Sequence, residues 1–198
     1  MTAPGRDTAM PTLAYAILAL LAREPLTGYE MSRLLRDPIG LFWQARHSQI
    51  YPTLSRLEQA GWTTSQQAPG PGPRPTSRHA ITDIGLDALR RWVASPPGRR
   101  SSRDELLLRV YASWVVDAPT IIAILREAEA RHAKQLREYL SRRDRTVASG
   151  GPGPARSAGF ADYATLRRGI GFERGRLAWV RWLIQQIEDD PEQDTGRR

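Results

Sequence analysis

The sequence predicts a mainly α-helical protein, in which three helices, a two-stranded β-hairpin and a fourth helix are followed by a region that is helical throughout. Two observations support this fold class. Apolar residues recur at helical spacing through most of the 198 residues, and at residues 63–81 strand-forming residues surround a segment rich in Pro and Gly. We therefore expect two domains, residues 1–95 with the hairpin and residues 96–198 without one.

Composition and charge favour a cytoplasmic protein with an anionic partner. The chain carries 29 basic and 21 acidic residues, a formal net charge of +8. It contains no cysteine, which excludes disulfides and thiolate chemistry and fits a reducing compartment. The longest apolar run, residues 13–22, is too short to cross a bilayer, and it continues into Arg23 and Glu24 as a helical pattern instead of ending as a signal peptide does.

The first two helices are delimited by prolines and by a capping pair. The apolar run at residues 13–22 predicts a buried helix that ends before Glu24-Pro25, because a residue that precedes proline avoids the helical conformation. In "TGYE", Thr27 and Glu30 stand three apart, and each side chain can accept a hydrogen bond from the other's backbone N–H. We therefore expect the second helix to begin at Thr27 and to end at Asp37-Pro38.

A third helix is predicted for "SQIYPTLSRLEQAG", with Ser48 as its N-cap and Gly61 at its C-terminus. Pro52 is tolerated if it lies in the first turn, where backbone N–H groups have no partner inside the helix. Leu54 and Leu57 repeat at helical spacing and face a core. The other face carries short or forked hydrogen-bonding groups, namely Ser48, Gln49, Tyr51, Thr53 and Arg56.

The segment after Gly61 predicts a β-hairpin and a fourth helix. "WTTSQQ" and "RHAI" contain strand formers, "APGPGPRPTS" between them suits a hairpin tip, and Thr82 caps the helix "DIGLDALRRWV". This order of elements is that of a winged helix-turn-helix. In that architecture the third helix enters the DNA major groove, while the wing arginines, here Arg74 and Arg78, reach the flanking backbone or minor groove. The stretch is locally cationic, because Glu58 is its only acid between Pro38 and Thr82.

Four segments resemble the PadR family of bacterial transcriptional regulators: "LAYAILALLAREPLTGYEMSRLL", "FW" at residues 42–43, "SQIYPTLSRLEQAGW" and "TDIG". The resemblance covers roughly the first 90 residues. It implies a DNA-binding winged helix and, from the chain length, a C-terminal helical dimerisation domain. One residue departs from the pattern, because His79 stands where an aromatic residue commonly follows the wing arginine. The residues expected to bind DNA are Ser48, Gln49, Tyr51, Pro52, Thr53, Arg56, Arg74 and Arg78.

The second domain is predicted to contain three helices. Ser102 and Glu105 form a capping box for the first of them. Asp117 caps a long helix to about Arg145, whose arginine-rich end is better explained by favourable charge at a helix C-terminus than by a nucleic-acid patch. A flexible linker at residues 148–159 and a last helix from Asp162 to about Glu188 complete the chain.

The last helix carries an apolar seam at the alternating 4,3 spacing of a coiled coil, interrupted only by Glu173. The long helix of the same subunit could be its partner, but Trp179 and Trp182 widen the apolar surface and favour a bundle shared between two subunits. The residues expected at this dimer interface are Leu166, Ile170, Leu177, Val180, Ile184 and Ile187 on the seam, with Trp179 and Trp182 beside it.

The sequence therefore predicts a homodimeric repressor that reads an inverted repeat of double-stranded DNA, with a helical adaptor that does not bind DNA as the alternative. The resemblance implies release by a small aromatic or lipophilic effector, although aromatic residues at helical spacing also suit a plain core. An enzyme is not expected, because the three histidines lack metal-ligand spacing and no nucleophile or phosphate-loop motif is present. No cofactor, metal site or membrane contact is expected either. The candidate effector-lining residues are Tyr15, Phe42, Trp43 and Trp114.

Overall fold

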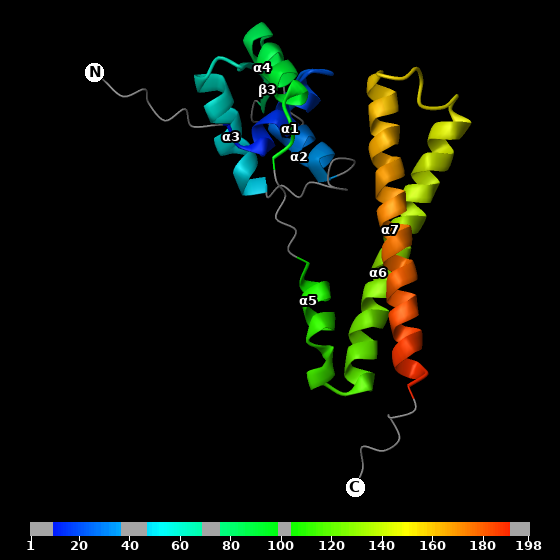
Figure 1. The fold of residues 1–198 in the computed structure, drawn as a ribbon. Coiled ribbons are helices and arrows are strands. Elements are labelled where there is room, and N and C mark those ends of the chain that lie inside the picture. Colours follow the sequence, from blue (N-terminus) through cyan, green and yellow to red (C-terminus); the bar gives the residue numbers. More distant parts are fainter. Residues whose placement is uncertain (1–9, 37–46, 69–75, 99–103, 191–198) are drawn as a thin grey trace. The chain divides into compact units, whose positions relative to one another are not determined.

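The computed structural model describes residues 10–36, 47–68, 76–98 and 104–190 (Figure 1). The chain divides into two compact units, Met1–Gly98 and Arg99–Arg198. The fold class is confirmed, because the described chain is mainly helical with one small antiparallel sheet. The elements of the first unit are α1 (Thr12–Leu21), β1 (Leu26–Thr27), α2 (Gly28–Arg36), α3 (His47–Gln59), β2 (Thr63–Ala68), β3 (Thr76–Ile81) and α4 (Asp83–Ala94). Those of the second are α5 (Glu105–Tyr111), η2 (Ser113–Val115), α6 (Ala118–Ala148) and α7 (Ala158–Glu188).

The core of the first unit joins α1 to the inner faces of α2 and α3. α1 contributes Ile17 and Leu18, which are fully buried, and it is apolar on most sides because the other helices surround it. The stripe predicted for α3 is buried as expected, whereas on α4 Ile84, Trp92 and Val93 are exposed and only Leu89 of its larger apolar residues joins the core. The residues that meet there include Met31 and Leu35 of α2, Ile50, Leu54 and Leu57 of α3, and Leu89 of α4.

The wing is part of a three-stranded antiparallel sheet in the order β1-β3-β2. β2 and β3 form the predicted hairpin, from the pair Thr63 and Ile81 to the pair Ala68 and Thr76. β1 was not predicted, since two residues carry no strand periodicity. It exists because the chain between α1 and α2 runs beside β3, where Leu26 pairs with His79 and Thr27 with Arg78.

The ends of α3 differ in how well the sequence predicts them. At the C-terminus Gly61 adopts a φ of 70°, its N–H bonds to the Glu58 carbonyl at 2.9 Å, and the Trp62 N–H bonds to the Leu57 carbonyl at 2.9 Å. This is the Schellman arrangement, so the predicted terminal glycine is confirmed. At the N-terminus the helix begins at His47, so Ser48 lies inside its first turn and the prediction of Ser48 as the cap is wrong.

The second unit is built on the antiparallel pair α6 and α7, which run side by side (Figure 1). Ile121 and Leu125 of α6 pack with Val180 and Ile184 of α7. Each helix is capped at its start: Asp117 accepts a hydrogen bond from Thr120 N at 2.9 Å, and Ser157 accepts one from Phe160 N at 3.1 Å. α7 therefore begins four residues before the predicted Asp162.

Two further predictions for this unit need correction. The cap of α5 is Asp104, whose carboxylate accepts from Leu107 N at 3.2 Å, whereas the predicted cap Ser102 lies outside the described residues. The connection between α6 and α7 is shorter than the linker expected at residues 148–159. It spans residues 149–157 and reverses the chain through positive φ at Gly150, Gly151 and Gly153.

The coiled-coil seam of α7 is buried within a single chain. Five of the residues predicted at the dimer interface, Leu166, Ile170, Leu177, Val180 and Ile184, are at most 5 % exposed. Because the antiparallel α6 supplies a matching apolar stripe, the intrasubunit alternative explains this periodicity. These five residues are thus not a free surface for a second subunit, whereas Trp182 is exposed and Trp179 and Ile187 are half-buried.

Candidate nucleic-acid interface

α3 separates an apolar inner face from a polar outer face. Ile50, Leu54 and Leu57 are buried, and they hold the helix on α1. The outer face agrees with the prediction for most positions, and its side chains are exposed to solvent. The exposed residues there are Ser48, Gln49, Tyr51, Pro52 and Arg56.

Thr53 does not belong to that outer face. It is only 6 % exposed, and its hydroxyl donates to the Gln49 carbonyl at 2.6 Å. At 100° per residue, a position three after Ile50 and four before Leu57 shares their stripe. The prediction that Thr53 faces outward is therefore wrong, and its hydroxyl is committed to the backbone of its own helix.

Pro52 also has a different setting from the one predicted. It is the sixth residue of α3 and lies in the second turn, where a residue other than proline would donate its N–H to the Ser48 carbonyl. That carbonyl therefore loses its usual donor at the exposed N-terminal end of the helix. Water or a ligand can satisfy it there, so the proline is tolerated at a position where a buried helix would be destabilised.

The N-terminal half of α3 borders an open groove of about 740 Å³. Its other wall is the start of α1, whose N-cap Pro11 offers no side-chain hydrogen bond to the first turn. Unpaired N–H groups at a helix start favour negative charge, and Arg56 adds a full positive charge to the groove. No acid lies among the described residues that line it, which are Pro11, Thr12, Leu13, Ser48, Gln49, Pro52, Thr53 and Arg56.

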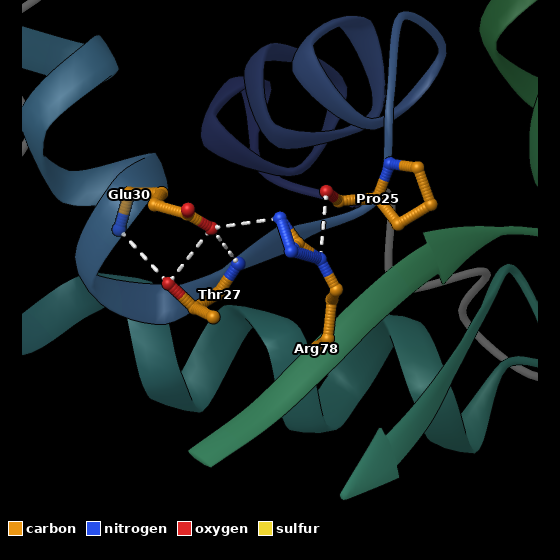
Figure 2. Close-up of polar contacts among 4 residues, drawn as sticks. All are labelled: Pro25, Thr27, Glu30 and Arg78. Carbon is orange, nitrogen blue, oxygen red and sulfur yellow. Dashed lines mark hydrogen bonds and ion pairs between the residues drawn. The ribbon is translucent and has the colours of Figure 1, made fainter. Parts of the chain in front are cut away.

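Arg78 lies in the middle of β3, where it pairs with Gln66, and its side chain contacts Pro25 and the first turn of α2 (Figure 2). Its Nε donates to the Pro25 carbonyl at 3.2 Å, and its Nη2 lies 3.5 Å from Glu30 Oε2. The same carboxylate completes the predicted capping box, because it accepts from Thr27 N at 2.8 Å while Glu30 N donates to Thr27 Oγ1 at 3.2 Å. The Thr27 backbone N–H is the largest of the contacts that lower the pKa of Glu30.

The two predicted wing arginines, Arg74 and Arg78, have different outcomes. The Arg78 side chain is 42 % exposed, so part of it faces solvent while its nitrogens contact Pro25 and Glu30. Arg74, at the predicted wing tip, lies outside the described residues. The sequence missed the inward contacts of Arg78, because nothing in the wing indicates that the Pro25 carbonyl will lie beside it.

His79 is buried in the middle strand of the sheet. It is 8 % exposed, it pairs with Leu26 on one side and Ser65 on the other, and its Nδ1 has no hydrogen-bond partner. Burial lowers the pKa of His79, and the Glu58 carboxylate opposes that shift only in part. The position that departs from the family pattern thus holds a neutral imidazole used as an apolar group.

Acid should therefore destabilise the first unit through His79. The folded state binds a proton on His79 less tightly than the unfolded chain does, so this contribution is present above the unfolded pKa of 6.5 and is lost as the pH falls below it. We expect the free energy of unfolding to fall between pH 7.5 and 5.5, by at most about 1.4 kcal/mol per pH unit from this single group. Urea denaturation of the wild type and of His79→Phe measures it, and an equal acid loss in both proteins contradicts it.

Of the predicted effector-lining residues, Tyr15 of the first unit has aromatic neighbours. Tyr15 stacks on Trp92, with ring centroids 4.8 Å apart and planes at 6°, and it also meets Trp62 at 6.1 Å. The sequence did not predict that Tyr15, Trp62 and Trp92 would pack together. Trp114 belongs to the second unit and is 84 % exposed, while Phe42 and Trp43 lie outside the described residues.

The second unit contains a groove of about 420 Å³ between α5 and α7. Arg168 lies over the Phe172 ring at 5.7 Å, and Arg176 lies over the Trp179 ring at 5.1 Å. Arg176 also pairs with Asp104, the cap of α5. The sequence did not reveal this groove. Its lining residues are Leu107, Arg168, Gly171, Phe172, Gly175, Arg176 and Trp179.

Comparison with known proteins assigns both units. The model of the transcriptional regulator PadR-like family matches residues 17–91, and the model named virulence activator alpha C-term matches residues 102–188. The first unit therefore contains a PadR-like domain. The resemblance predicted from the motifs is thereby confirmed, and it extends beyond the winged helix to the C-terminal unit.

The similarity to one relative extends over almost the whole chain. The negative transcriptional regulator PadR of Bacillus subtilis is 26 % identical over 182 residues, 91 % of this chain and 100 % of the relative. The crystal structure of that protein in complex with operator DNA superposes with a TM-score of 0.79 at 25 % identity, over 89 % of this chain and 99 % of the other. Its complex with p-coumaric acid gives a TM-score of 0.73 at 25 % identity, over 93 % and 100 %.

Two features are absent from residues 10–36, 47–68, 76–98 and 104–190. No helix in these ranges is long and apolar enough to span a membrane. The same ranges hold no group of three or more metal-ligating side chains close enough together to bind an ion.

Proposed function

We propose that this PadR-like chain is a homodimeric repressor that binds an inverted-repeat operator with α3 and is released by a small aromatic acid. The observation that carries the DNA-binding part is the outer face of α3. There Gln49 and Arg56 are exposed in a groove that no acid among the described residues lines, and Tyr51 is exposed on the same helix. A buried stripe holds this helix from behind. The operator complex of the Bacillus subtilis relative supports this choice of partner.

Each exposed group on α3 has a distinct use in a major groove. The Gln49 amide can pair with the edge of adenine, and the Arg56 guanidinium can bind guanine or a phosphate. Tyr51 offers an apolar ring face for a thymine methyl group and a hydroxyl for phosphate. Ser48 lies at the start of the helix, where backbone and hydroxyl groups meet the DNA backbone.

Alanine at Arg56 or at Tyr51 should weaken DNA binding without unfolding the protein. Both side chains are exposed, so little packing is lost, and each lost contact should reduce affinity by about tenfold. Fluorescence anisotropy with a duplex from the region upstream of the chain's own gene measures this at two salt concentrations. Arg56→Ala should also reduce the salt dependence, because one phosphate contact is removed.

Arg90→Ala is the matched control for this experiment. It also removes one exposed positive charge from the first unit, but Arg90 lies on α4 and pairs with Asp87 at 2.8 Å. We expect its affinity to stay close to that of the wild type. Unchanged affinity in both α3 variants would reject α3 as the helix that contacts the DNA bases. A dimer that shows no salt-sensitive DNA binding would favour the alternative of a helical adaptor.

The exposed apolar surface of α5 and η2 supports a dimer. Leu108, Tyr111, Trp114 and Val115 are each more than 60 % exposed, and monomeric proteins seldom leave such a group in water. Two copies related by a two-fold axis would present two α3 helices to half-sites about 34 Å apart. Light scattering of the full chain should give twice the mass of one subunit, and a monomer would contradict the dimeric part.

The groove between α5 and α7 supports release by an aromatic acid. A phenolic acid needs an apolar slot for its ring and a cation for its carboxylate, and Phe172 and Trp179 stand there beside Arg168, while Arg176 is paired with Asp104. The p-coumaric acid complex of the Bacillus subtilis relative suggests the ligand class. Addition of p-coumaric acid should lower the anisotropy of the DNA complex, and an unchanged signal would contradict release by this acid.

A further inference from the structure

The Tyr51 ring lies directly over Gly28, the first residue of α2. A Cβ atom at Gly28 would stand 2.7 Å from Tyr51 Cε1, 2.9 Å from Cζ and 3.0 Å from the hydroxyl oxygen. Side chains do not tolerate approaches below 3.0 Å, so any residue other than glycine at position 28 must move the ring. The absence of a Cβ at position 28 therefore permits the Tyr51 ring to lie where it does.

The backbone conformation of Gly28 does not by itself require glycine. Among the described glycines, positive φ occurs at Gly61, Gly150, Gly151 and Gly153, and Gly28 is not among them. It opens a helix, where alanine is the better helix former. Glycine thus weakens α2 locally, and the close approach of the Tyr51 ring is a physical reason for its presence.

The same turn of α2 also binds the wing. Thr27 and Glu30 cap the helix on either side of Gly28, and Glu30 together with the Pro25 carbonyl holds Arg78 of β3 (Figure 2). The segment 25–30 therefore contacts one side chain from the reading helix and one from the wing. Both proposed DNA-binding elements, α3 and the wing, thus contact this segment.

We propose that Gly28 is a positioning residue for DNA binding, which acts by seating the Tyr51 ring against the first turn of α2. The proposal rests on the proposed function, since it takes Tyr51 as a DNA contact. Tyr51 is 51 % exposed, so one part of the side chain faces solvent while the ring edge rests on the glycine. A ring held in this way loses less conformational freedom when DNA binds, and displacing it makes the contact weaker.

A double-mutant cycle tests this proposal with the full-length protein. The four proteins are the wild type, Gly28→Ala, Tyr51→Ala and the double variant, and the probe is the labelled duplex from upstream of the chain's own gene. We expect Gly28→Ala to weaken binding about fivefold. In the Tyr51→Ala background the same substitution should have no further effect, because the ring it displaces is already absent.

Urea denaturation of the same proteins separates positioning from folding. Gly28→Ala should unfold at the same or a higher urea concentration, since alanine favours the helix and the half-exposed ring can move aside. An equal loss of affinity on both backgrounds would show that Gly28 acts through the fold and would overturn the proposal.

Failure of this inference can be told from failure of the proposed function. Wild-type affinity in Gly28→Ala, with weakened binding in Tyr51→Ala, removes the positioning role but leaves the Tyr51 contact intact. Wild-type affinity in Tyr51→Ala removes the contact, and with it the basis for a role of Gly28. Full coupling between the two substitutions supports both.

Discussion

Alanine in place of Gly85 should lower the free energy of unfolding of the first unit by about 3 kcal/mol or more. A Cβ atom at Gly85 would stand 2.1 Å from the Trp62 carbonyl oxygen and 3.1 Å from an Ile81 side-chain carbon. The first of these neighbours is backbone, so no side-chain rotation relieves the overlap. The first turn of α4 has to move away from the turn that follows α3.

That movement would break a network that joins three elements. Thr82 N donates to the Trp62 carbonyl at 3.0 Å, and Thr82 Oγ1 donates to the Gly61 carbonyl at 2.7 Å. Gly85 N in turn donates to Thr82 Oγ1 at 3.1 Å, which is the predicted N-cap of α4. Displacing α4 strains these bonds together, which is why a single methyl group should have a large effect.

Urea denaturation followed by circular dichroism measures the loss, with Gly98→Ala as the matched control. A Cβ atom at Gly98 meets nothing within 4 Å, and its φ is not in the positive range. We expect Gly98→Ala to unfold at the wild-type urea concentration. If Gly85→Ala were as stable as this control, the close packing of α4 on the Trp62 carbonyl would be wrong.

Replacement of His132 by leucine should destabilise the second unit by about 2 to 4 kcal/mol. His132 Nδ1 lies 2.6 Å from Glu173 Oε2, and the two side chains are 20 % and 9 % exposed. Glu173 is the polar interruption of the α7 seam, and His132 of α6 is its partner. Without His132, a buried carboxylate is left without the group that satisfies it.

The double variant His132→Leu/Glu173→Leu is the control that separates pairing from packing. When both polar groups are replaced, the seam becomes continuous and no buried group lacks a partner. We expect its free energy of unfolding to return to within about 1 kcal/mol of the wild type, or to exceed it. A double variant as unstable as the single one would mean that the shape of His132, and not its pairing with Glu173, stabilises the packing of α6 on α7.

Local features of this protein followed from the sequence alone. The capping pair Thr27 and Glu30, the terminal Gly61 and the Thr82 cap were all predicted, because each depends on residues within a few positions along the chain. The family motifs extend this success to the fold class, since their spacing encodes the winged helix. Most of the outer face of α3 was also predicted from periodicity.

Contacts between segments that are far apart in the sequence were revealed only by the tertiary structure. Thr53 was assigned to the wrong face because its hydroxyl suggested an outward role, although its angular position places it beside Ile50. The seam of α7 needed a partner, but its periodicity is the same for a helix of the same subunit and for one of another. β1, the contacts of Arg78 and the approach of Tyr51 to Gly28 each join segments more than 20 residues apart. Local sequence patterns do not predict such contacts, because the contacts form only when the packed core brings the segments together.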